Sequence, residues 1–462
     1  MRLTSNRQGN KGTTVVRVAA VALWLAVWQL ASLLVAQPLI LPGPAGVASS
    51  LLGLVTSGAF WGKVGFSAAR ILGGMLAAYV LALVLATLSH ASTAVRALVR
   101  VPLAAIKSTP VVCVVVLLLI WLGSANVSVA AVFLMALPGV YFPVLEGLDQ
   151  IAGGLDEVFS LHGVRGAARV LGCAWPQVLP YVIAASEMVV GMSWKAGVAA
   201  ELIGVPAGSI GERIYQAKLL LDTADLFAWT IAVIAIASVC ERVFLRLVRA
   251  SGAAAVRAAV IMRLSPAGAR VEGARGGWRL RGVRLCHGVT ASVSVRVENG
   301  GRLCVMAPSG AGKTTLLRTL ARLEDALAGD VAGPRALSVE SQDARLVEDA
   351  SALCNVALTA GPGVGVDEIR ELLGRLVPGV DADAVVRDLS GGQRRRVELA
   401  RALLAPGDSV LLDEPFAGLD DVARDLACDV IAGELRGRSL IVSTHDARDA
   451  ARLEADTLVL AG

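Results

Sequence analysis

The N-terminal third of this chain lacks acidic side chains, and this absence limits what the chain can fold into. No aspartate or glutamate occurs before Glu146, and the same stretch contains long runs of Val, Leu, Ile and Ala. From about residue 270 onward the sequence has the charged composition of a soluble domain. With 55% hydrophobic residues over 462 positions, the whole chain is too apolar for an ordinary soluble enzyme. We therefore predict a membrane domain followed by a cytosolic domain.

Apolar stretches of about 20 residues, the length that crosses a bilayer, recur in the N-terminal part. The six predicted spans are 15–36, 68–88, 101–122, 127–148, 178–202 and 226–248. We expect the first span to stay uncleaved, because the residues that follow it, from Gln37 to Pro42, are a poor signal-peptidase site. In a six-span arrangement these basic residues fall on one side, together with the basic N-terminus: Arg96, Arg100, Arg165, Arg169, Arg242, Arg246 and Arg249. Basic residues favour the cytoplasmic side, so we predict a multi-pass protein of the cell membrane with both termini in the cytoplasm.

Charge and cysteine usage narrow the functional classes further. The net charge is +5, but the basic residues cluster beside the spans, which favours contact with lipid over nucleic acid. The seven cysteines are scattered without a Cys-x-x-Cys pair, so we expect reduced packing residues and no metal site. Lys195 and Glu201 fall in the fifth predicted span. Ionisable groups at such positions mark either a solute pathway or a structural partner, and the sequence leaves both open.

The connection between the fourth and fifth spans, about residues 151–180, differs from a simple loop. It contains Glu157 and Gly163, and then the pairs Trp175-Pro176 and Leu179-Pro180. Glycine permits a left-handed turn and proline suits the first turn of a helix, so this pattern predicts short helices forming a compact cytoplasmic protrusion. We predict a membrane domain over 1–249, a basic Gly/Ala-rich linker over 250–277 and a soluble domain over 278–462.

A phosphate-binding loop is predicted between a short apolar strand and the start of a helix. The loop and its flank are Ala307, Pro308, Ser309, Gly310, Ala311, Gly312, Lys313, Thr314 and Thr315. Glycines let backbone N–H groups converge on phosphate oxygens at a helix N-terminus. Lys313 supplies a positive charge to the β- and γ-phosphates, and Thr314 offers a hydroxyl to Mg²⁺. Ala307 replaces the first glycine of the usual pattern, and its small side chain should still permit the turn.

A second strand carries two carboxylates at its end. The run Ser409-Val410-Leu411-Leu412 has the continuous apolar character of a buried parallel strand. Asp413 follows it and is expected to bind Mg²⁺, directly or through water. Glu414 is the expected general base that polarises the attacking water.

Together with Leu389-Ser390-Gly391-Gly392-Gln393, these motifs resemble the ATPase of the ABC transporter family. The resemblance implies an α/β P-loop ABC ATPase after an all-α polytopic membrane domain. It also implies that Ser390, Gly391, Gly392 and Gln393 form a signature that meets the γ-phosphate bound by a second subunit. Arg394, Arg395 and Arg396, which follow the signature, are expected to be a solvated helix face.

The same resemblance assigns roles to three further residues. Gln342 matches the glutamine that senses Mg²⁺ and the membrane domain, and His445 matches the switch histidine that contacts the γ-phosphate. His287, or Cys286 beside it, aligns with the aromatic residue that usually stacks on adenine. Base stacking would then be weak, or mediated by the imidazole of His287 in place of the usual aromatic residue.

The membrane part resembles permeases of the nitrate, sulfonate and taurine importers, whose "EAA" loop carries a glutamate and a glycine at the positions of Glu157 and Gly163. The likeness covers about residues 15–250 and includes the stretches 106–123 and 194–201. It implies ATP-driven import of a small solute, with ATP and Mg²⁺ as cofactors, a homodimer of this chain and an extracellular solute-binding protein. An exporter half-transporter and a nucleotide-gated membrane regulator are the alternatives. The solute itself stays open.

Overall fold

The computed structural model describes residues 6–151, 153–264, 277–287, 292–308, 310–342 and 345–460, with side chains from residue 15 onward. The chain divides into two compact units. The helical unit comprises Met1–Asp149 and Tyr181–Val248. The sheet unit comprises Gln150–Pro180 and Arg249–Gly462. The segment between the fourth and fifth predicted spans therefore packs with the C-terminal part of the chain.

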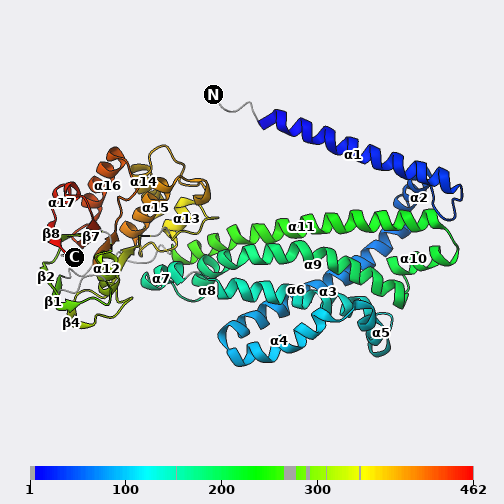
Figure 1. Cartoon of the computed structure of the whole chain (residues 1–462), viewed down its shortest axis with the longest axis horizontal. Coiled ribbons are helices and arrows are strands. Elements are labelled where there is room, and N and C mark those ends of the chain that lie inside the picture. The colour runs from blue at the N-terminus through cyan, green and yellow to red at the C-terminus, as the bar shows by residue number, and fades with distance from the viewer. Residues whose placement is uncertain are drawn as a thin grey trace. The chain divides into compact units, whose positions relative to one another are not determined.

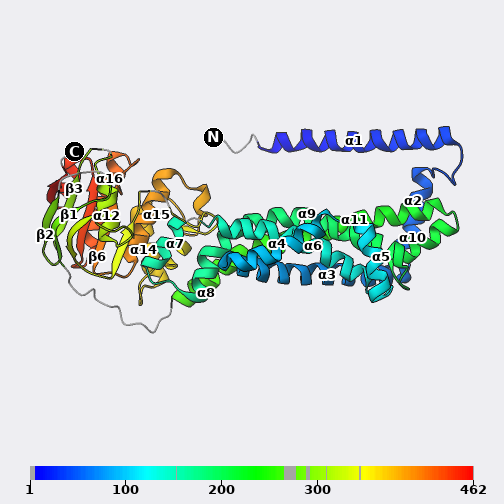
Figure 2. The same ribbon diagram turned by 60° about the horizontal axis from the view of Figure 1, so that its bottom comes forward.

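The helical unit is built from long apolar helices, which Figure 1 shows as the blue, cyan and green ribbons. Their bounds are α1 Asn6–Val35, α2 Pro44–Val55, α3 Gly58–Ala91, α4 Thr93–Ser108, α5 Val111–Leu122, α6 Val127–Asp149, α9 Trp175–Gly204, α10 Ile210–Leu219 and α11 Thr223–Arg263. Small residues allow α3 and α6 to pack closely, since a Cβ added at Gly74 would lie 2.5 Å from the carbonyl oxygen of Val129. Figure 2 shows α1 apart from the packed helices, and none of its apolar stretch is buried.

The number of spans differs from the six that the sequence predicts. Among the described residues, four helical segments are long and apolar enough to cross a membrane: Val15–Val35, Gly58–Ala91, Val127–Asp149 and Gly166–Gly204. The predicted span 101–122 is broken into α4 and α5, which meet at an angle of 106°. Pro110 lies at the break, and proline cannot continue the backbone hydrogen bonds of a helix. Counting this bent pair as one span gives five.

The sixth predicted span, 226–248, is part of α11, a helix of 41 residues that is not among these candidates. The helix continues to Arg263 through the beginning of the segment 250–277, where we expected a linker. Alanine has the highest helix propensity of all residues, and this stretch is rich in alanine, which explains the continuation. The rest of the expected linker, 265–276, lies outside the described residues.

The two ionisable residues of the fifth predicted span have different surroundings in the helical unit. Glu201 is fully buried and accepts hydrogen bonds from the Ser67 hydroxyl at 2.7 Å and from the Gly211 N–H at 3.3 Å. These contacts make Glu201 a structural partner between α3, α9 and α10. Lys195 instead lines a cavity of about 740 Å³ between α9 and α11, together with Glu187 and Glu241.

The sheet unit contains a five-stranded parallel sheet in the order β5-β6-β7-β3-β8 and a three-stranded antiparallel sheet in the order β2-β1-β4. The strands are β1 Trp278–Arg284, β2 Val293–Val297, β3 Arg302–Met306, β4 Ala328–Ala332, β5 Leu337–Glu340, β6 Ser409–Asp413, β7 Ser439–Thr444 and β8 Asp456–Val459. Every residue of β6 and β7 is buried, as expected for central parallel strands covered on both faces.

Helices surround the parallel sheet, and their bounds complete the sheet unit. They are α7 Gly153–Leu161, α8 Gly166–Arg169, the π-helix η1 Val170–Ala174, α12 Lys313–Leu320, α13 Ala352–Ala357, α14 Val366–Leu376, the 3₁₀ turn η2 Val386–Asp388, α15 Gly391–Leu404, α16 Asp421–Glu434 and α17 Ala447–Arg452. The core divides between the two faces of the sheet. Leu316 of α12 packs with Leu411 and Ile441, while α13, α14, α15 and α16 pack together in a second cluster. The predicted fold class, apolar helices followed by an α/β ATPase-type domain, is confirmed.

Candidate functional site

The carboxyl ends of four parallel strands bring the predicted site residues to one edge of the sheet. β6 and β7 pair in register so that Asp413 lies opposite Ser443, and β3 pairs with β7 so that Met306 lies opposite Thr444. Glu340, the last residue of β5, lies opposite Leu412. Ligands of open parallel α/β sheets bind outside this edge, in the crevices where neighbouring connections diverge. The residues that follow β3, β5, β6 and β7 therefore border the expected ligand site.

The loop after β3 turns sharply into α12. Gly310 and Gly312 have φ angles of +81° and +92°, a region that disfavours residues with a Cβ, and Gly312 caps the N-terminus of α12. The first backbone N–H groups of a helix lack partners within the helix and favour anions, so this turn suits a phosphate. Ala307 is buried at the end of the strand, while Pro308 is exposed. Ser309 lies outside the described residues.

Lys313 points back toward the strand ends and is almost fully buried. Its Nζ donates a hydrogen bond to the carbonyl oxygen of Ala307 at 2.8 Å and lies 3.2 Å from Oε1 of Glu414. A buried ammonium group needs negative partners, and a carboxylate and a carbonyl provide them here. The phosphate-loop lysine and the predicted catalytic carboxylate are thus in direct contact.

Asp413 and Glu414 are held by a serine that the sequence analysis did not single out. The Ser443 hydroxyl donates to Oδ1 of Asp413 at 2.6 Å and accepts from the backbone N–H of Glu414 at 2.9 Å. Glu414 has a φ of +50°, a conformation that costs a non-glycine residue about 1 to 3 kcal/mol and persists only where the surroundings impose it. The only sequence signal for Ser443 is its place at the end of a buried strand, next to His445.

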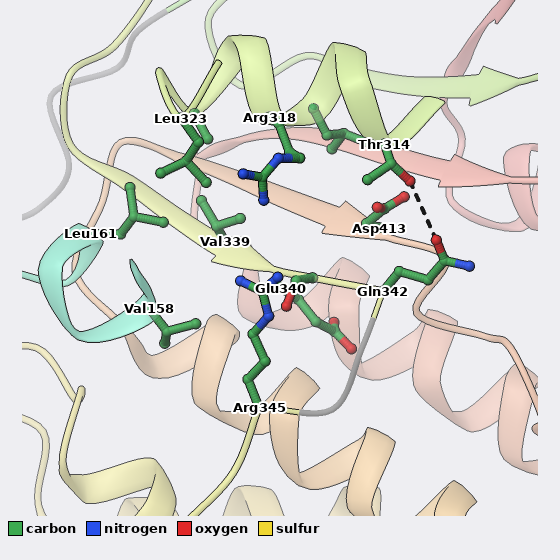
Figure 3. A pocket seen from close by; sticks show the side chains of 13 residues that line it. Val158, Leu161, Thr314, Arg318, Leu323, Val339, Glu340, Gln342, Arg345 and Asp413 are labelled. Atoms are coloured by element: carbon green, nitrogen blue, oxygen red, sulfur yellow. Dashed lines mark hydrogen bonds between the residues drawn. The ribbon is translucent and has the colours of Figure 1, made fainter. Parts of the chain in front are cut away.

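Oxygen-bearing side chains, Thr314, Gln342 and Asp413 among them, line one cavity beside the phosphate loop, as Figure 3 shows. The cavity has a volume of about 90 Å³ and is lined by Thr314, Gln342 and Asp413, with Val158 and Leu161 of α7 among its other residues. The Thr314 hydroxyl donates to Oε1 of Gln342 at 3.4 Å. A hydroxyl, an amide carbonyl and a carboxylate are the ligand types that Mg²⁺ prefers. The donor set therefore fits a magnesium ion that takes its remaining ligands from water and phosphate oxygens.

The signature residues form the exposed N-terminus of α15. Ser390 caps the helix by accepting from the Gln393 N–H at 3.3 Å, and the Gln393 side chain accepts from the Ser390 N–H at 2.8 Å. This reciprocal pair is a capping box, which fixes the start of the helix. Ser390 and Gly391 are exposed, and a Cβ at Gly392 would lie 3.4 Å from Leu419. Within the described part of the chain, no hydrogen bond or ion pair joins the signature to Lys313, Thr314 or Asp413.

The two histidines of the expected site are both exposed. His445 directly follows β7, so it lies at the same sheet edge as Asp413 and Glu414. His287 follows β1 and Leu285, and residues 288–291 after it lie outside the described part of the chain. Neighbouring Cys286 is half-buried, with its Sγ 3.7 Å from Oε2 of Glu324. The two histidines therefore follow different strands, β1 and β7.

The segment with the predicted coupling residues packs inside the sheet unit. Oε2 of Glu157 accepts from Arg345 at 2.9 Å and lies 3.4 Å from an Nη atom of Arg318, which belongs to α12. Gly163, just after α7, has a φ of +67°, which explains the glycine there. Through these two arginines, Glu157 contacts both the helix that follows the phosphate loop and the segment that follows Gln342.

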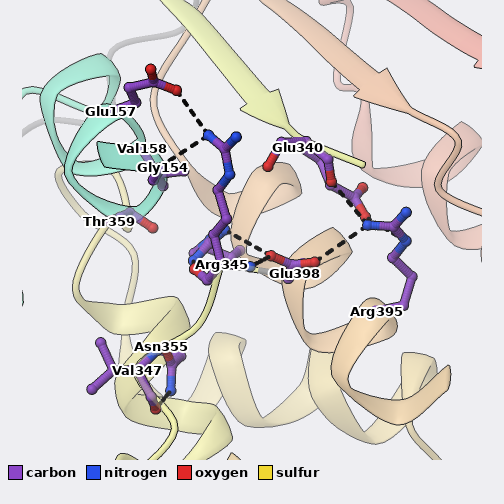
Figure 4. A network of polar contacts seen from close by, with 12 residues as sticks. Gly154, Glu157, Val158, Glu340, Arg345, Val347, Asn355, Thr359, Arg395 and Glu398 are labelled. Atoms are coloured by element: carbon purple, nitrogen blue, oxygen red, sulfur yellow. Dashed lines mark hydrogen bonds and ion pairs between the residues drawn. The ribbon is translucent and has the colours of Figure 1, made fainter. Parts of the chain in front are cut away.

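One expectation about the signature helix is wrong. Arg394, Arg395 and Arg396 were predicted to form a solvated helix face, but Arg395 is only 7% exposed. It lies among Glu340 and Glu398, both buried, as Figure 4 shows. The run of three arginines gave no sign that Arg395 points inward, because successive residues of a helix point in different directions.

Comparisons with known proteins agree with this architecture. Residues 71–253 match the family described as "Binding-protein-dependent transport system inner membrane component", and residues 290–417 match the family described as "ABC transporter". The aliphatic sulfonates import ATP-binding protein SsuB 3 of Rhodococcus jostii is 37% identical over 188 residues, which are 39% of this chain and 70% of that protein. The SsuB 1 protein of Paracoccus denitrificans is 35% identical over 176 residues, 37% of this chain and 73% of that protein.

Two further similarities concern another import protein and a solved structure. The thiamine import ATP-binding protein ThiQ of Mesorhizobium japonicum is 36% identical over 174 residues, 34% of this chain and 69% of that protein. The dimeric structure of MJ0796, a bacterial ABC transporter cassette, aligns with a TM-score of 0.35 at 23% identity and covers 40% of this chain and 94% of that one. The similarity to the sulfonate import proteins and the two family matches lead to one conclusion. The chain belongs to the ABC transporter family and joins, in one polypeptide, an inner-membrane component of the binding-protein-dependent type and an ABC ATPase domain.

Proposed function

We propose that this chain imports a small organic sulfonate or a related anion across the cytoplasmic membrane, driven by ATP. The observation that carries the proposal is the contact of Glu157 with Arg318 and Arg345. It ties the segment between two membrane helices to the elements that follow the phosphate loop and Gln342. The similarity to sulfonate import proteins supports the direction of transport and the class of solute.

In the proposed cycle, the residues at the sheet edge bind and hydrolyse ATP. The N–H groups after Gly310 and Gly312, together with Lys313, hold the phosphates, and His287 contacts the adenine. Thr314, Gln342 and Asp413 would hold Mg²⁺, which would supply positive charge to the phosphoryl oxygens. Glu414 orients and deprotonates the attacking water, and His445 contacts the γ-phosphate.

The active unit that we propose is a homodimer. Ser390, Gly391 and Gln393 are at an exposed helix N-terminus, where backbone N–H groups favour an anion. A two-fold axis would bring the signature of each copy to the phosphate loop of the other, so that two ATP molecules close the pair. Closure would then move the segment 151–180, with Glu157 and Gly163, and change the access of the solute pathway. In this proposal the domain bounds are 1–249, 250–277 and 278–462, and both termini are cytoplasmic.

The cavity between α9 and α11 supports a small charged solute. Lys195 provides a positive charge for a sulfonate group, while Glu187 and Glu241 suit a cationic group at the other end of an aminosulfonate. Ionisable side chains within membrane helices are costly and usually serve a pathway or a partner. We therefore expect an extracellular solute-binding protein to deliver an alkanesulfonate or aminoalkanesulfonate to this unit.

The first experiment measures ATP hydrolysis by the purified chain in nanodiscs, with and without solute-binding proteins from the same genome. Each binding protein is loaded in turn with an alkanesulfonate, an aminoalkanesulfonate or thiamine. Stimulation that requires a sulfonate-loaded binding protein supports the proposal, while stimulation only with thiamine would change the solute class. Hydrolysis that ignores every binding protein but responds to hydrophobic compounds would point to export instead.

The Glu414→Gln variant tests the assigned chemistry in the same assay. The amide cannot accept the proton of water, so hydrolysis should fall by about 10² or more while ATP stays bound. Retained nucleotide is measured after gel filtration with radiolabelled ATP. Turnover close to that of the unmodified chain would remove Glu414 from the role of general base.

A further inference from the structure

Arg395 lies on α15, two residues after the signature glutamine, and its side chain is buried. Its guanidinium donates to the carbonyl oxygen of Ser341 at 2.9 Å and to the carbonyl oxygen of Glu414 at 3.2 Å. Ser341 precedes Gln342, and Glu414 has the strained backbone described above. A single side chain of α15 thus bonds to the main chain of two segments, one after β5 and one after β6. Both segments lie at the edge of the sheet formed by the carboxyl ends of the strands, where ATP is proposed to bind (the nucleotide edge). A planar guanidinium suits this task, since its donors have a fixed fork geometry.

Buried carboxylates hold Arg395 in this position. Oε2 of Glu398 lies 3.5 Å from Arg395, and Oε1 of Glu340 lies 3.8 Å from it. Both glutamates are almost fully buried, and neither carboxylate oxygen of Glu340 has a hydrogen-bond partner among the described atoms. Such a group is tolerated only beside a compensating charge, which Arg395 supplies together with Arg401.

The same network continues to the coupling segment, as Figure 4 shows. Oε1 of Glu398 accepts the backbone N–H of Arg345, and the side chain of Arg345 donates to Oε2 of Glu157 at 2.9 Å and to the carbonyl oxygen of Gly154 at 3.2 Å. Contacts therefore run without a gap from Glu157 through Arg345, Glu398 and Arg395 to the main chain of Glu414. Buried polar networks of this kind are rigid when their members are satisfied.

We propose that Arg395 is a positioning residue for ATP hydrolysis, and that Glu398 and Arg345 connect it to Glu157 of the coupling segment. Displacement of that segment then moves the backbone of Glu414 through side chains, independently of Gln342. This inference rests on the proposed role of Glu414 as the general base. The hydrogen bonds of Arg395 at this edge go to main-chain carbonyls of Ser341 and Glu414, so its loss should lower kcat without a comparable change in the KM for ATP.

The test compares substitutions of Arg395 with a matched arginine elsewhere in the sheet unit. Arg438 also donates to main-chain carbonyls of separate segments, Leu403 at 2.7 Å and Glu434 at 2.9 Å, but it precedes β7 at the opposite edge of the sheet. Arg438→Gln therefore removes similar hydrogen bonds without reaching the nucleotide edge. Arg395→Lys keeps the charge of Arg395 but cannot form the fork.

Loss of Arg395 alone removes one of the two arginines that compensate Glu340 and Glu398, so a second variant also neutralises Glu340. The double variant Arg395→Gln, Glu340→Gln removes one positive and one negative charge together, and Glu340→Gln alone removes the 3.8 Å ion pair but keeps the hydrogen bonds of Arg395 to Ser341 and Glu414. ATP hydrolysis is measured in nanodiscs for all variants, beside the unmodified chain and Glu414→Gln, with the melting temperature of each.

We expect Arg395→Lys and the double variant to lose about 10- to 100-fold in kcat, the range typical of a misplaced catalytic group, with the KM for ATP within about two-fold. Arg438→Gln should stay near the unmodified kcat, and Glu340→Gln, which keeps the hydrogen bonds of Arg395 to Ser341 and Glu414, should lose less than the double variant. A double variant that is as stable as Arg438→Gln and retains its kcat would overturn the inference. Hydrolysis that persists in Glu414→Gln would instead refute the proposed function, so the two failures are distinguishable.

Discussion

The stability of the sheet unit should fall in mild acid because of one buried histidine, His162 at the end of α7. The side chain is 3% exposed, and its Nδ1 lies 2.7 Å from the carbonyl oxygen of Val158. Burial, followed by the nearby charge of Arg401, lowers the pKa of His162 from 6.5 to about 4. The folded unit therefore keeps this imidazole neutral at pH values where the unfolded chain takes up a proton.

The sign and the size of the effect follow from this difference. Because the folded pKa is depressed, the contribution to stability is complete above about pH 6.5 and is lost as the pH falls toward 4. Proton linkage between these two pKa values gives a loss of about 2 kcal/mol between pH 7.5 and pH 5. For a unit of this size, about 2 °C of melting temperature corresponds to 1 kcal/mol, so the transition should move down by about 4 °C.

Scanning calorimetry of the purified chain at pH 7.5 and pH 5 measures this shift, with His162→Gln as the test variant. Glutamine cannot take up a proton, so the shift between the two pH values should shrink by about 4 °C. His287→Gln is the matched control, because His287 is exposed and should leave the shift unchanged. An equal shift in the unmodified chain and in His162→Gln would refute the assignment to His162.

Two further predictions concern helix packing and coupling. Gly74→Ala should destabilise the helical unit by about 1 to 3 kcal/mol in a thermal unfolding assay, because the added Cβ would lie 2.5 Å from the Val129 carbonyl oxygen. Gly73→Ala is the control and should be neutral in the same assay, since the added Cβ there meets nothing within 4 Å. Glu157→Gln should lower solute uptake per ATP hydrolysed several-fold while leaving basal hydrolysis near normal, because it weakens contacts with two arginines. Asp156→Asn, which removes the neighbouring ion pair with Arg169, is its control, and equal losses in both variants would refute a specific role of Glu157.

The nucleotide edge could be predicted from the sequence because its motifs are local. The phosphate loop, the strand that ends at Asp413 and the helix start at Ser390 each depend on a few consecutive residues, whose backbone conformation follows from glycine and from capping. Their convergence then follows from the rule that parallel strands present their carboxyl ends at one edge. The fold class and the resemblance to sulfonate importers were accessible for the same reason.

The remaining features depend on contacts between residues far apart in the sequence. Arg345 is 188 residues from Glu157, and Ser443 is 30 residues from Asp413, so no local pattern joins either pair. The break at Pro110 was visible as a proline, but a proline within an apolar stretch is also compatible with a kinked single span. The burial of Arg395 was hidden because a run of three arginines is usually a solvated helix face.

The position of Arg395 on α15 has a consequence for the homodimer that we propose. The N-terminus of this helix is exposed at Ser390, while a side chain just over one turn further, Arg395, reaches inward to the carbonyl oxygen of Glu414. The phosphate of a nucleotide bound by the partner subunit would therefore contact α15 at Ser390. Through Arg395, the same helix holds the backbone of Glu414, the proposed general base of its own subunit. Each site would then sense occupancy of the other through α15, so the two ATP molecules should be hydrolysed cooperatively. Since the capping box already fixes the helix start, this coupling needs no rearrangement within α15, only a small displacement of the whole helix.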